Sequence, residues 1–229
     1  QEMNHTAFSR RWLLPFLITE GLLYAAFLYL DLALPGSGWD VPLKYGGIVL
    51  CFLWTLGTAG NRDGRLTGIA LVFTLLADLF LLVLNRWYLA GVSAFCVVQL
   101  LYLARLHRAG CRPLAFRLLL RAALAGALLA AAGALGGLTP LTGLTLFYFS
   151  QLVANAFASL SLGRRGRSFS LGLFLFIGCD VCVGLRNLSA ALPGMAPLPF
   201  LPFVQVGMWL FYLPSQVLIS LSAGRLCDD

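Results

Sequence analysis

Apolar residues fill the chain in long runs, and short polar or Gly- and Pro-containing stretches separate these runs. A run of about 20 apolar residues is long enough to cross a bilayer as an α-helix. We therefore predict an all-α, polytopic membrane helical bundle that forms a single integral membrane domain over residues 1–229. Because the connections are short, neighbouring helices should run antiparallel. The eight predicted spans are 13–34, 41–59, 67–85, 88–106, 115–136, 139–162, 168–188 and 197–222.

The composition agrees with a membrane location. Hydrophobic residues make up 60% of the chain and charged residues only 11%, whereas a soluble domain holds about 25% charged residues. The six cysteines lie mostly inside apolar runs, and no close pair flanks a histidine in metal-ligand spacing. We interpret them as small apolar side chains. The cysteines therefore predict no metal site.

The positive charges predict an orientation. The net charge is +7, and nearly all arginines outside the apolar runs fall on one side of an eight-span arrangement with both termini inside. This is the positive-inside bias of membrane proteins, so the basic character needs no nucleic acid as a partner. We expect a multi-pass protein with both termini cytoplasmic, in the cytoplasmic membrane of a bacterium or the endoplasmic reticulum membrane of a eukaryote. The arginines are Arg10, Arg11, Arg62, Arg65, Arg105, Arg108, Arg112, Arg117, Arg164, Arg165, Arg167 and Arg225.

A polar motif occurs twice along the chain. The pattern is R-x-G-R, then twelve residues, Asp, six residues and Asn, and the second copy lies 102 positions after the first. It falls on the third and seventh spans, which run in the same direction. This predicts two parallel four-helix halves, 11–110 and 113–225, a known membrane architecture. The pattern joins Arg62, Gly64, Arg65, Asp78 and Asn85 in the first copy and Arg164, Gly166, Arg167, Asp180 and Asn187 in the second.

The two aspartates are the main candidates for a site. A charged carboxylate at the centre of a membrane helix costs about 2.5–3.5 kcal/mol on insertion scales. At about 1.5 Å per residue, Asp78 and Asp180 each lie roughly 20 Å from the inner arginine of their motif, and hence at one depth. Each asparagine should share the helical face of its aspartate. Further polar residues reach that level and are candidate substrate-binding groups: Lys44, Asn85, Arg86, Gln99, Tyr102, Tyr148, Arg186, Asn187, Tyr212 and Gln216.

Three functions stay open from the residues alone. Two nearby carboxyl groups can supply a general acid beside a base or stabilising carboxylate, and so can cleave a bond through an oxocarbenium ion. They can equally carry protons or cations in a transporter. In a non-catalytic protein they would pair with Lys44, Arg86 or Arg186, while the polar groups of the fourth and sixth spans would join helices.

Five segments, in order, resemble the YhhN family of eight-span membrane proteins, which includes animal lysoplasmalogenases. "PLKYGGIVLCFLW" (42–54) is similar to its lysine-bearing second helix, and "ALVFTLLADLFLLV" (70–83) with "GVSAFCVVQLLYLARL" (91–106) to its first Asp helix and the helix after it. "LGLFLFIGCDVCVGLRNL" (171–188) resembles the second Asp helix, and "WLFYLPSQVLISLSA" (209–223) the closing Tyr-and-Gln helix. The chain departs from the family pattern at Tyr45, Ala77, Gln99, Cys179 and Phe211, which indicates a divergent member.

The resemblance implies hydrolysis of the vinyl-ether bond of a lysoplasmalogen or a related lysolipid. Asp78 and Asp180 would be catalytic, one as the acid and the other as the group that stabilises the cation and positions water. Lys44, Arg86 or Arg186 would hold the phosphate of the headgroup. The partners would be a lysophospholipid substrate and the lipid bilayer, and the reaction would need no metal or organic cofactor.

Overall fold

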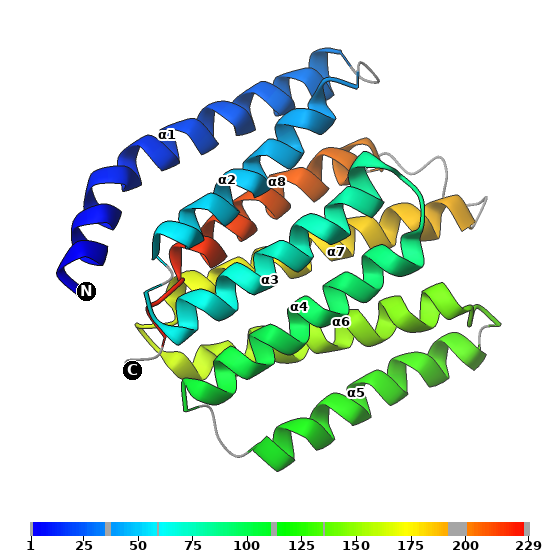
Figure 1. Ribbon diagram of the computed structural model, residues 1–229. Helices are drawn as coiled ribbons and strands as arrows, with labels where there is room; N and C mark the ends of the chain where they lie inside the picture. Colours follow the sequence, from blue (N-terminus) through cyan, green and yellow to red (C-terminus); the bar gives the residue numbers. More distant parts are fainter. Residues whose placement is uncertain are drawn as a thin grey trace.

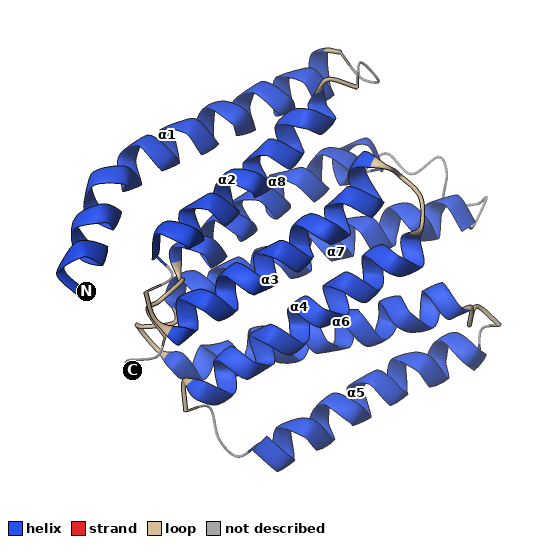
Figure 2. Cartoon of the chain, in the orientation of Figure 1, coloured by secondary structure: helices blue, strands red, loops and turns tan. Residues whose placement is uncertain are grey.

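The computed structural model describes residues 2–34, 38–58, 60–110, 114–134, 136–191 and 201–226. This part of the chain consists of helices and their short connections and contains no strand (Figure 2), as the all-α prediction requires. One α-helix falls on each predicted span. The helices are α1 (Glu2–Ala33), α2 (Asp40–Thr58), α3 (Arg62–Asp78), α4 (Tyr88–Arg108), α5 (Leu114–Ala134), α6 (Pro140–Ser159), α7 (Arg167–Ala191) and α8 (Leu201–Leu221), with a π-helical turn, η1 (Leu79–Val83), and a 3-10 turn, η2 (Leu160–Leu162).

Several helices are long and apolar enough to cross a bilayer. Five segments within the described ranges meet both conditions, and two shorter apolar helices cover Leu118–Ala134 and Val206–Leu221. A multi-pass membrane protein follows from these lengths and compositions, whereas the crossing of all eight helices stays a prediction. The five segments are Arg11–Ala33, Arg62–Val83, Tyr88–Arg108, Pro140–Leu162 and Arg167–Asn187.

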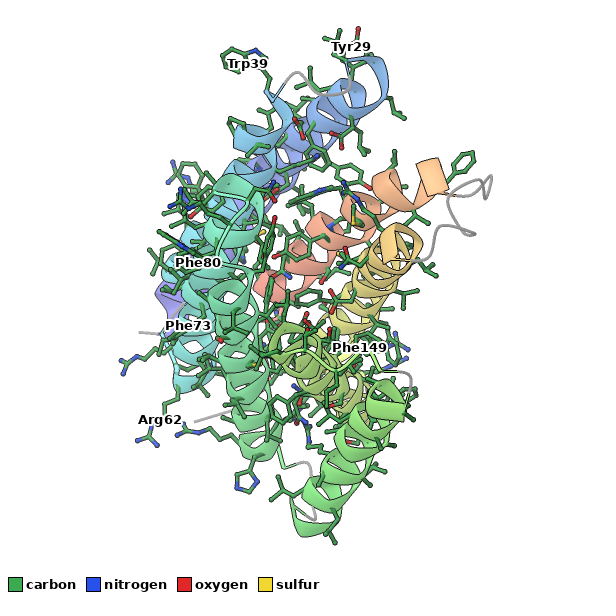
Figure 3. The ribbon with its side chains drawn as sticks, turned by 90° about the vertical axis from the view of Figure 1, so that its right-hand side faces the viewer. Tyr29, Trp39, Arg62, Phe73, Phe80 and Phe149 are labelled. Carbon is green, nitrogen blue, oxygen red and sulfur yellow. The ribbon has the colours of Figure 1, made fainter. Side chains whose placement is uncertain are left out.

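The helices lie side by side along one direction, and both chain ends lie at the same end of the bundle (Figure 1). α1 flanks one side next to α2, and α5 flanks the opposite side next to α6, while α7 and α8 pack along their length. Tyr29 and Trp39 lie near one end of the molecule and Arg62 near the other (Figure 3). We call the end with Trp39 distal and the end with Arg62 proximal.

A buried ion pair fixes the proximal end. Nε and Nη2 of Arg105 donate to the two carboxylate oxygens of Asp63 at 2.8 and 2.9 Å, and both residues are almost fully buried. Arg105 also donates to the carbonyl of Ser222 at 3.2 Å, and the backbone N–H groups of Gly224 and Leu226 donate to Asp63 at 2.9 and 3.4 Å. The pair therefore joins α3, α4 and the turn after α8.

The close approach of α7 and α8 depends on Gly172. A Cβ atom at this position would lie 2.7 Å from Cγ1 of Ile219 and 3.0 Å from the carbonyl oxygen of Ser215. A methyl group has no room there, because one of the two neighbours is backbone.

We therefore expect Gly172→Ala to lower the free energy of unfolding by about 1–3 kcal/mol through overpacking. Gly126→Ala on α5 is the matched control, because a Cβ at that glycine meets no atom within 4 Å and alanine favours a helix over glycine by about 0.8–1 kcal/mol. Thermal unfolding of both variants in detergent tests the prediction. Equal melting temperatures for the two variants would contradict it.

Candidate active site

Asp78 lies at a change of helix type. It is the last residue of α3, and the π-helical turn η1 follows at once; such turns within α-helices frequently mark functional sites. The carboxyl group is 5% exposed and accepts the hydroxyl of Tyr212, whose oxygen lies 2.9 and 2.7 Å from Oδ1 and Oδ2. This hydrogen bond joins α3 to α8 in the interior of the bundle.

Asp180 occupies a similar setting on α7. Its Oδ2 atom is buried, and the hydroxyl of Tyr148 on α6 lies next to the carboxyl group. Neither Oδ2 nor this hydroxyl completes a hydrogen bond with good geometry in the described part of the chain. Each aspartate thus faces one buried tyrosine from a neighbouring helix, but only Asp78 holds its tyrosine through a hydrogen bond.

The tyrosines beside the two aspartates contact one common ring. The ring of Phe176 lies between the two tyrosines, with its centroid 5.5 Å from Tyr212 and 6.4 Å from Tyr148. The third and seventh spans therefore bring their acidic residues into one region between α3, α6, α7 and α8.

Lys44 joins neither of these aspartates. Its Nζ atom forms ion pairs with Asp31 at 2.8 Å and with Asp40 at 2.7 Å, and no ion pair among the described residues reaches Asp78 or Asp180. The purely structural alternative predicts that each aspartate forms an ion pair with its own Lys or Arg. The described side chains do not form such pairs.

Lys44 nevertheless contacts the site through aromatic rings. Nζ lies 5.7 Å from the ring centroid of Phe27 and 5.0 Å from that of Trp209. The ring of Trp209 in turn packs edge-on against Tyr212 at 5.3 Å. A continuous series of contacts thus leads from the distal lysine to the tyrosine that binds Asp78.

The polar groups of α4 and α6 form a network between helices. Nδ2 of Asn155 donates to Oε1 of Gln99 at 2.8 Å. Arg121 on α5 donates to Asn155 at 2.6 Å and to Gln151 at 3.1 Å. This is the helix-joining role that the sequence left open for these groups. Arg121 was missed, although an arginine inside the predicted span 115–136 was a signal for a buried polar contact.

The distal candidates lie on the surface. Asn85 comes after the end of η1 and has a φ of 47°, and its side chain accepts the hydroxyl of Tyr88 at 2.9 Å. It does not share a helical face with Asp78, because the helix ends before it. Arg86 is exposed and lies over the ring of Trp87 at 4.5 Å. Arg186 and Asn187 on α7 are exposed as well.

Two more candidates are buried and incompletely bonded. Tyr102 and Gln216 are fully buried, and the hydroxyl of the first and both amide atoms of the second have no hydrogen-bond partner within the described ranges. Nε2 of Gln99 is in the same state. Buried polar atoms without partners are uncommon in folded proteins, so these side chains stay candidates for contact with a polar ligand.

The cysteines have no metal-binding partners where the chain is described. Cys51, Cys96, Cys179 and Cys182 are free thiols, and no group of three or more potential metal ligands is found among the described residues. Cys111 and Cys227 lie outside those residues.

Together these features define a polytopic helical membrane protein with two interior carboxyl groups, each beside a tyrosine that contacts Phe176. The family model for the YhhN family matches residues 39–223, and the chain belongs to the YhhN family. Comparisons with curated proteins and with solved structures found no match. The family match begins after α1, so Glu20, Phe27 and Asp31 come from outside the matched segment.

Proposed function

We propose that this protein is a lipid hydrolase that cleaves the vinyl-ether bond of a lysoplasmalogen or a related lysolipid. The observation that carries the proposal is that both aspartates lie beside tyrosines that contact one ring: Tyr212, which donates to Asp78, and Tyr148, which lies next to Asp180, both pack against Phe176. No cation is paired to either aspartate among the described residues. Membership of the YhhN family supports lysoplasmalogenase-like chemistry. Ionisable residues inside membrane proteins generally mark functional sites.

The reaction needs an acid and a water molecule. A protonated carboxyl group of the pair gives its proton to the β-carbon of the vinyl ether, and an oxocarbenium ion forms. Water adds to the cationic carbon and loses its proton to the carboxylate, which restores the acid. The hydroxyl of the resulting hemiacetal then loses its proton as the bond to the glycerol oxygen breaks, and that oxygen gains a proton, which releases a fatty aldehyde and the glycerophospho-headgroup. The other carboxylate stabilises the cation and orients the water.

Deuterium labelling tests this chemistry directly. The purified full-length protein in detergent is incubated in D2O with a vinyl-ether lysolipid, and the aldehyde is collected and reduced at once. We expect one deuterium at the carbon next to the former carbonyl, because the proton is transferred to carbon. A saturated alkyl-ether lysolipid with the same headgroup is the control and should yield no aldehyde. An absence of aldehyde from the vinyl-ether lipid would refute the proposed hydrolysis.

We expect Tyr212 to increase the reaction rate through its hydrogen bond to Asp78, without transferring a proton to the substrate. Tyr212→Phe removes the hydroxyl that Asp78 accepts but keeps the ring that packs against Trp209 and Phe176. A hydrogen bond to a charged group is worth about 1.5–3 kcal/mol, so we expect kcat to fall by about 10- to 100-fold while the protein stays folded. The rate of aldehyde release and the melting temperature together measure this. An unchanged kcat would show that the hydroxyl plays no part in the reaction.

One observation favours a transporter as the second candidate. Transporters use interrupted helices near their ion sites, and η1 interrupts the regular α-helix directly after Asp78. In that case the protein reconstituted into liposomes would dissipate a pH gradient, and Asp78→Asn would stop the flux. Aldehyde release without any flux would leave the hydrolase as the function.

A further inference from the structure

Five helices surround the interior of the bundle. α3 packs against α4, α4 against α6, α6 against α7, α7 against α8, and α8 against α3, so that together they form a closed circle of helices. Side chains inside this circle can contact helices that are not direct neighbours. Two aromatic contacts join α4 to α7 in this way: Phe95 with Phe176, at 5.6 Å between ring centroids, and Tyr102 with Phe169, at 5.3 Å.

The two aromatic contacts lie at different depths. Tyr102 follows Phe95 by seven positions on α4, and Phe176 follows Phe169 by seven positions on α7, which is about 10 Å along each helix. Arg105, at the proximal end, lies over the ring of Phe169. The contact of Tyr102 with Phe169 is therefore the proximal one, and the contact of Phe95 with Phe176 is the distal one, beside the tyrosines that accompany the two aspartates.

Two amide side chains lie at the depth between these aromatic contacts. Gln99 follows Phe95 by four positions and precedes Tyr102 by three, so these three side chains share one face of α4. On α8, Gln216 lies one turn proximal to Tyr212, whose ring belongs to the distal level. Gln99, Tyr102 and Gln216 are all 0% exposed. The interior on the proximal side of the aspartates is therefore polar although it is fully buried.

Several polar atoms of these side chains have no hydrogen-bond partner in the described part of the chain. Oε1 of Gln99 accepts Nδ2 of Asn155, which orients the amide and leaves Nε2 as a donor without a partner there. Both amide atoms of Gln216 and the hydroxyl of Tyr102 are in the same state. None of the three side chains is charged. Neutral donors and acceptors in one buried region suit water, which donates and accepts, and a buried water molecule typically binds about three such groups.

We propose that Gln99, Tyr102 and Gln216 bind ordered water between the two aromatic contacts, and that this water is the nucleophile of the hydrolysis. The second half of the inference rests on the proposed function. When the oxygen of a bound water molecule bonds to the oxocarbenium carbon, one of its O–H bonds breaks and the proton passes to the carboxylate. A hydrolase whose carboxyl groups lie inside a lipid bilayer needs such a site, because the bilayer core itself holds no water.

Radiolytic labelling tests the water site without any turnover. A brief X-ray pulse converts water bound inside a protein into hydroxyl radicals, which oxidise the aromatic rings beside it, and mass spectrometry locates the oxidised residues. The sample is the full-length protein in detergent without lipid substrate. We expect Phe169, which is 0% exposed, to be oxidised several times faster than Phe16, which is 6% exposed and packs on Trp54 in a separate apolar cluster. Oxidation of Phe169 no faster than that of Phe16 would overturn the inference.

Variants connect the bound water to its side chains. Gln216→Leu removes both amide atoms at similar volume and should reduce the oxidation of Phe169 several-fold. Ser220→Ala, one turn further along α8, is the matched control, because its buried hydroxyl already donates to the carbonyl of Val217 at 2.8 Å, and it should leave the oxidation unchanged. Tyr102→Phe keeps the ring that contacts Phe169 and provides the same test if Gln216→Leu does not fold. Unchanged oxidation in Gln216→Leu and Tyr102→Phe would contradict the assignment of these side chains.

Kinetics distinguish a site for the nucleophile from a site for the lipid. In Gln216→Leu we expect kcat for aldehyde release to fall by about 10- to 100-fold, because the water loses its orientation, while KM for the lysolipid stays unchanged. An unchanged kcat, whether or not KM rises, would overturn the assignment of this water as the nucleophile. Rapid oxidation of Phe169 without any aldehyde release by the wild-type protein would refute the proposed function instead and support the water site alone.

Discussion

Asp78→Asn and Asp180→Asn should each reduce aldehyde release from a vinyl-ether lysolipid by about 10²- to 10⁴-fold, the usual contribution of a general acid or base. Asparagine keeps the shape of the side chain and, at position 78, a hydrogen-bond acceptor for Tyr212, but it can neither donate a proton to carbon nor stabilise a cation by charge. The losses should be far from additive in the double variant, because both residues serve one proton-transfer sequence. The measurement is kcat at saturating lipid, alongside the melting temperature of each variant.

Glu20→Gln is the matched control for both substitutions. Glu20 is another buried carboxylic acid inside a membrane helix, 3% exposed, and its Oε1 accepts the thiol of Cys51 at 3.3 Å. It belongs to α1, outside the proposed reaction site, so its loss of charge should leave kcat within about twofold of wild type, since changes away from a site rarely affect chemistry strongly. A loss in the Glu20 variant as large as in the aspartate variants would show that any buried carboxylate supports the fold, and the assignment of Asp78 and Asp180 would fail.

The helices were predictable because the backbone N–H and C=O groups of a segment buried in lipid must form hydrogen bonds within the protein. An apolar run of sufficient length must be helical in a bilayer, and every such run corresponds to an α-helix. Helix ends were less predictable. α1 begins at Glu2 rather than near residue 13, with Pro15 inside the helix. Polar residues before position 13 end the hydrophobic run, but the helix continues through them.

The contacts between neighbouring helices at the site could not be predicted from the sequence. Spacing from the inner arginines gave a depth for Asp78 and Asp180, but it gave no partner for Lys44. The actual partners, Asp31 and Asp40, lie across a helical hairpin and one turn earlier on the same helix. Sequence periodicity indicates which face of a helix is polar, whereas the choice of neighbouring helix depends on packing between side chains distant in the chain.

The face argument failed at Asn85 for a local reason. It assumed an uninterrupted α-helix from Asp78 onward, with residues seven positions apart on one side. η1 changes the helical pitch directly after Asp78, and the chain leaves the helix at Leu84. The sequence "LFLLV" does not predict a π-helical turn, since all five residues are compatible with an α-helix. A π-helical turn is therefore a feature that the structure adds to the candidate site.

Arg105→Met should destabilise the folded protein more than any other single substitution considered for this chain. Its guanidinium group is fully buried, binds Asp63 with two hydrogen bonds and lies 4.5 Å over the ring of Phe169. Removing one partner of a buried ion pair costs about 3–5 kcal/mol, because the remaining charge stays buried without compensation. Unfolding by denaturant or heat in detergent measures the loss, and aldehyde release by the remaining folded protein should be unaffected, since Arg105 lies at the proximal end.

Two further variants separate charge from packing in this prediction. Arg108→Met, one turn along α4 at an exposed position, should change the free energy of unfolding by no more than about 0.5 kcal/mol. Adding Asp63→Asn to Arg105→Met removes the stranded carboxylate and keeps an acceptor for the N–H of Gly224. The double variant should therefore recover a large part of the lost stability, because the cost comes from an unpaired buried charge rather than from a missing contact. A lower free energy of unfolding in the double variant than in Arg105→Met alone would contradict this. The hydrogen bonds that Asp63 accepts from Gly224 and Leu226 would then stabilise the proximal end more than the ion pair does.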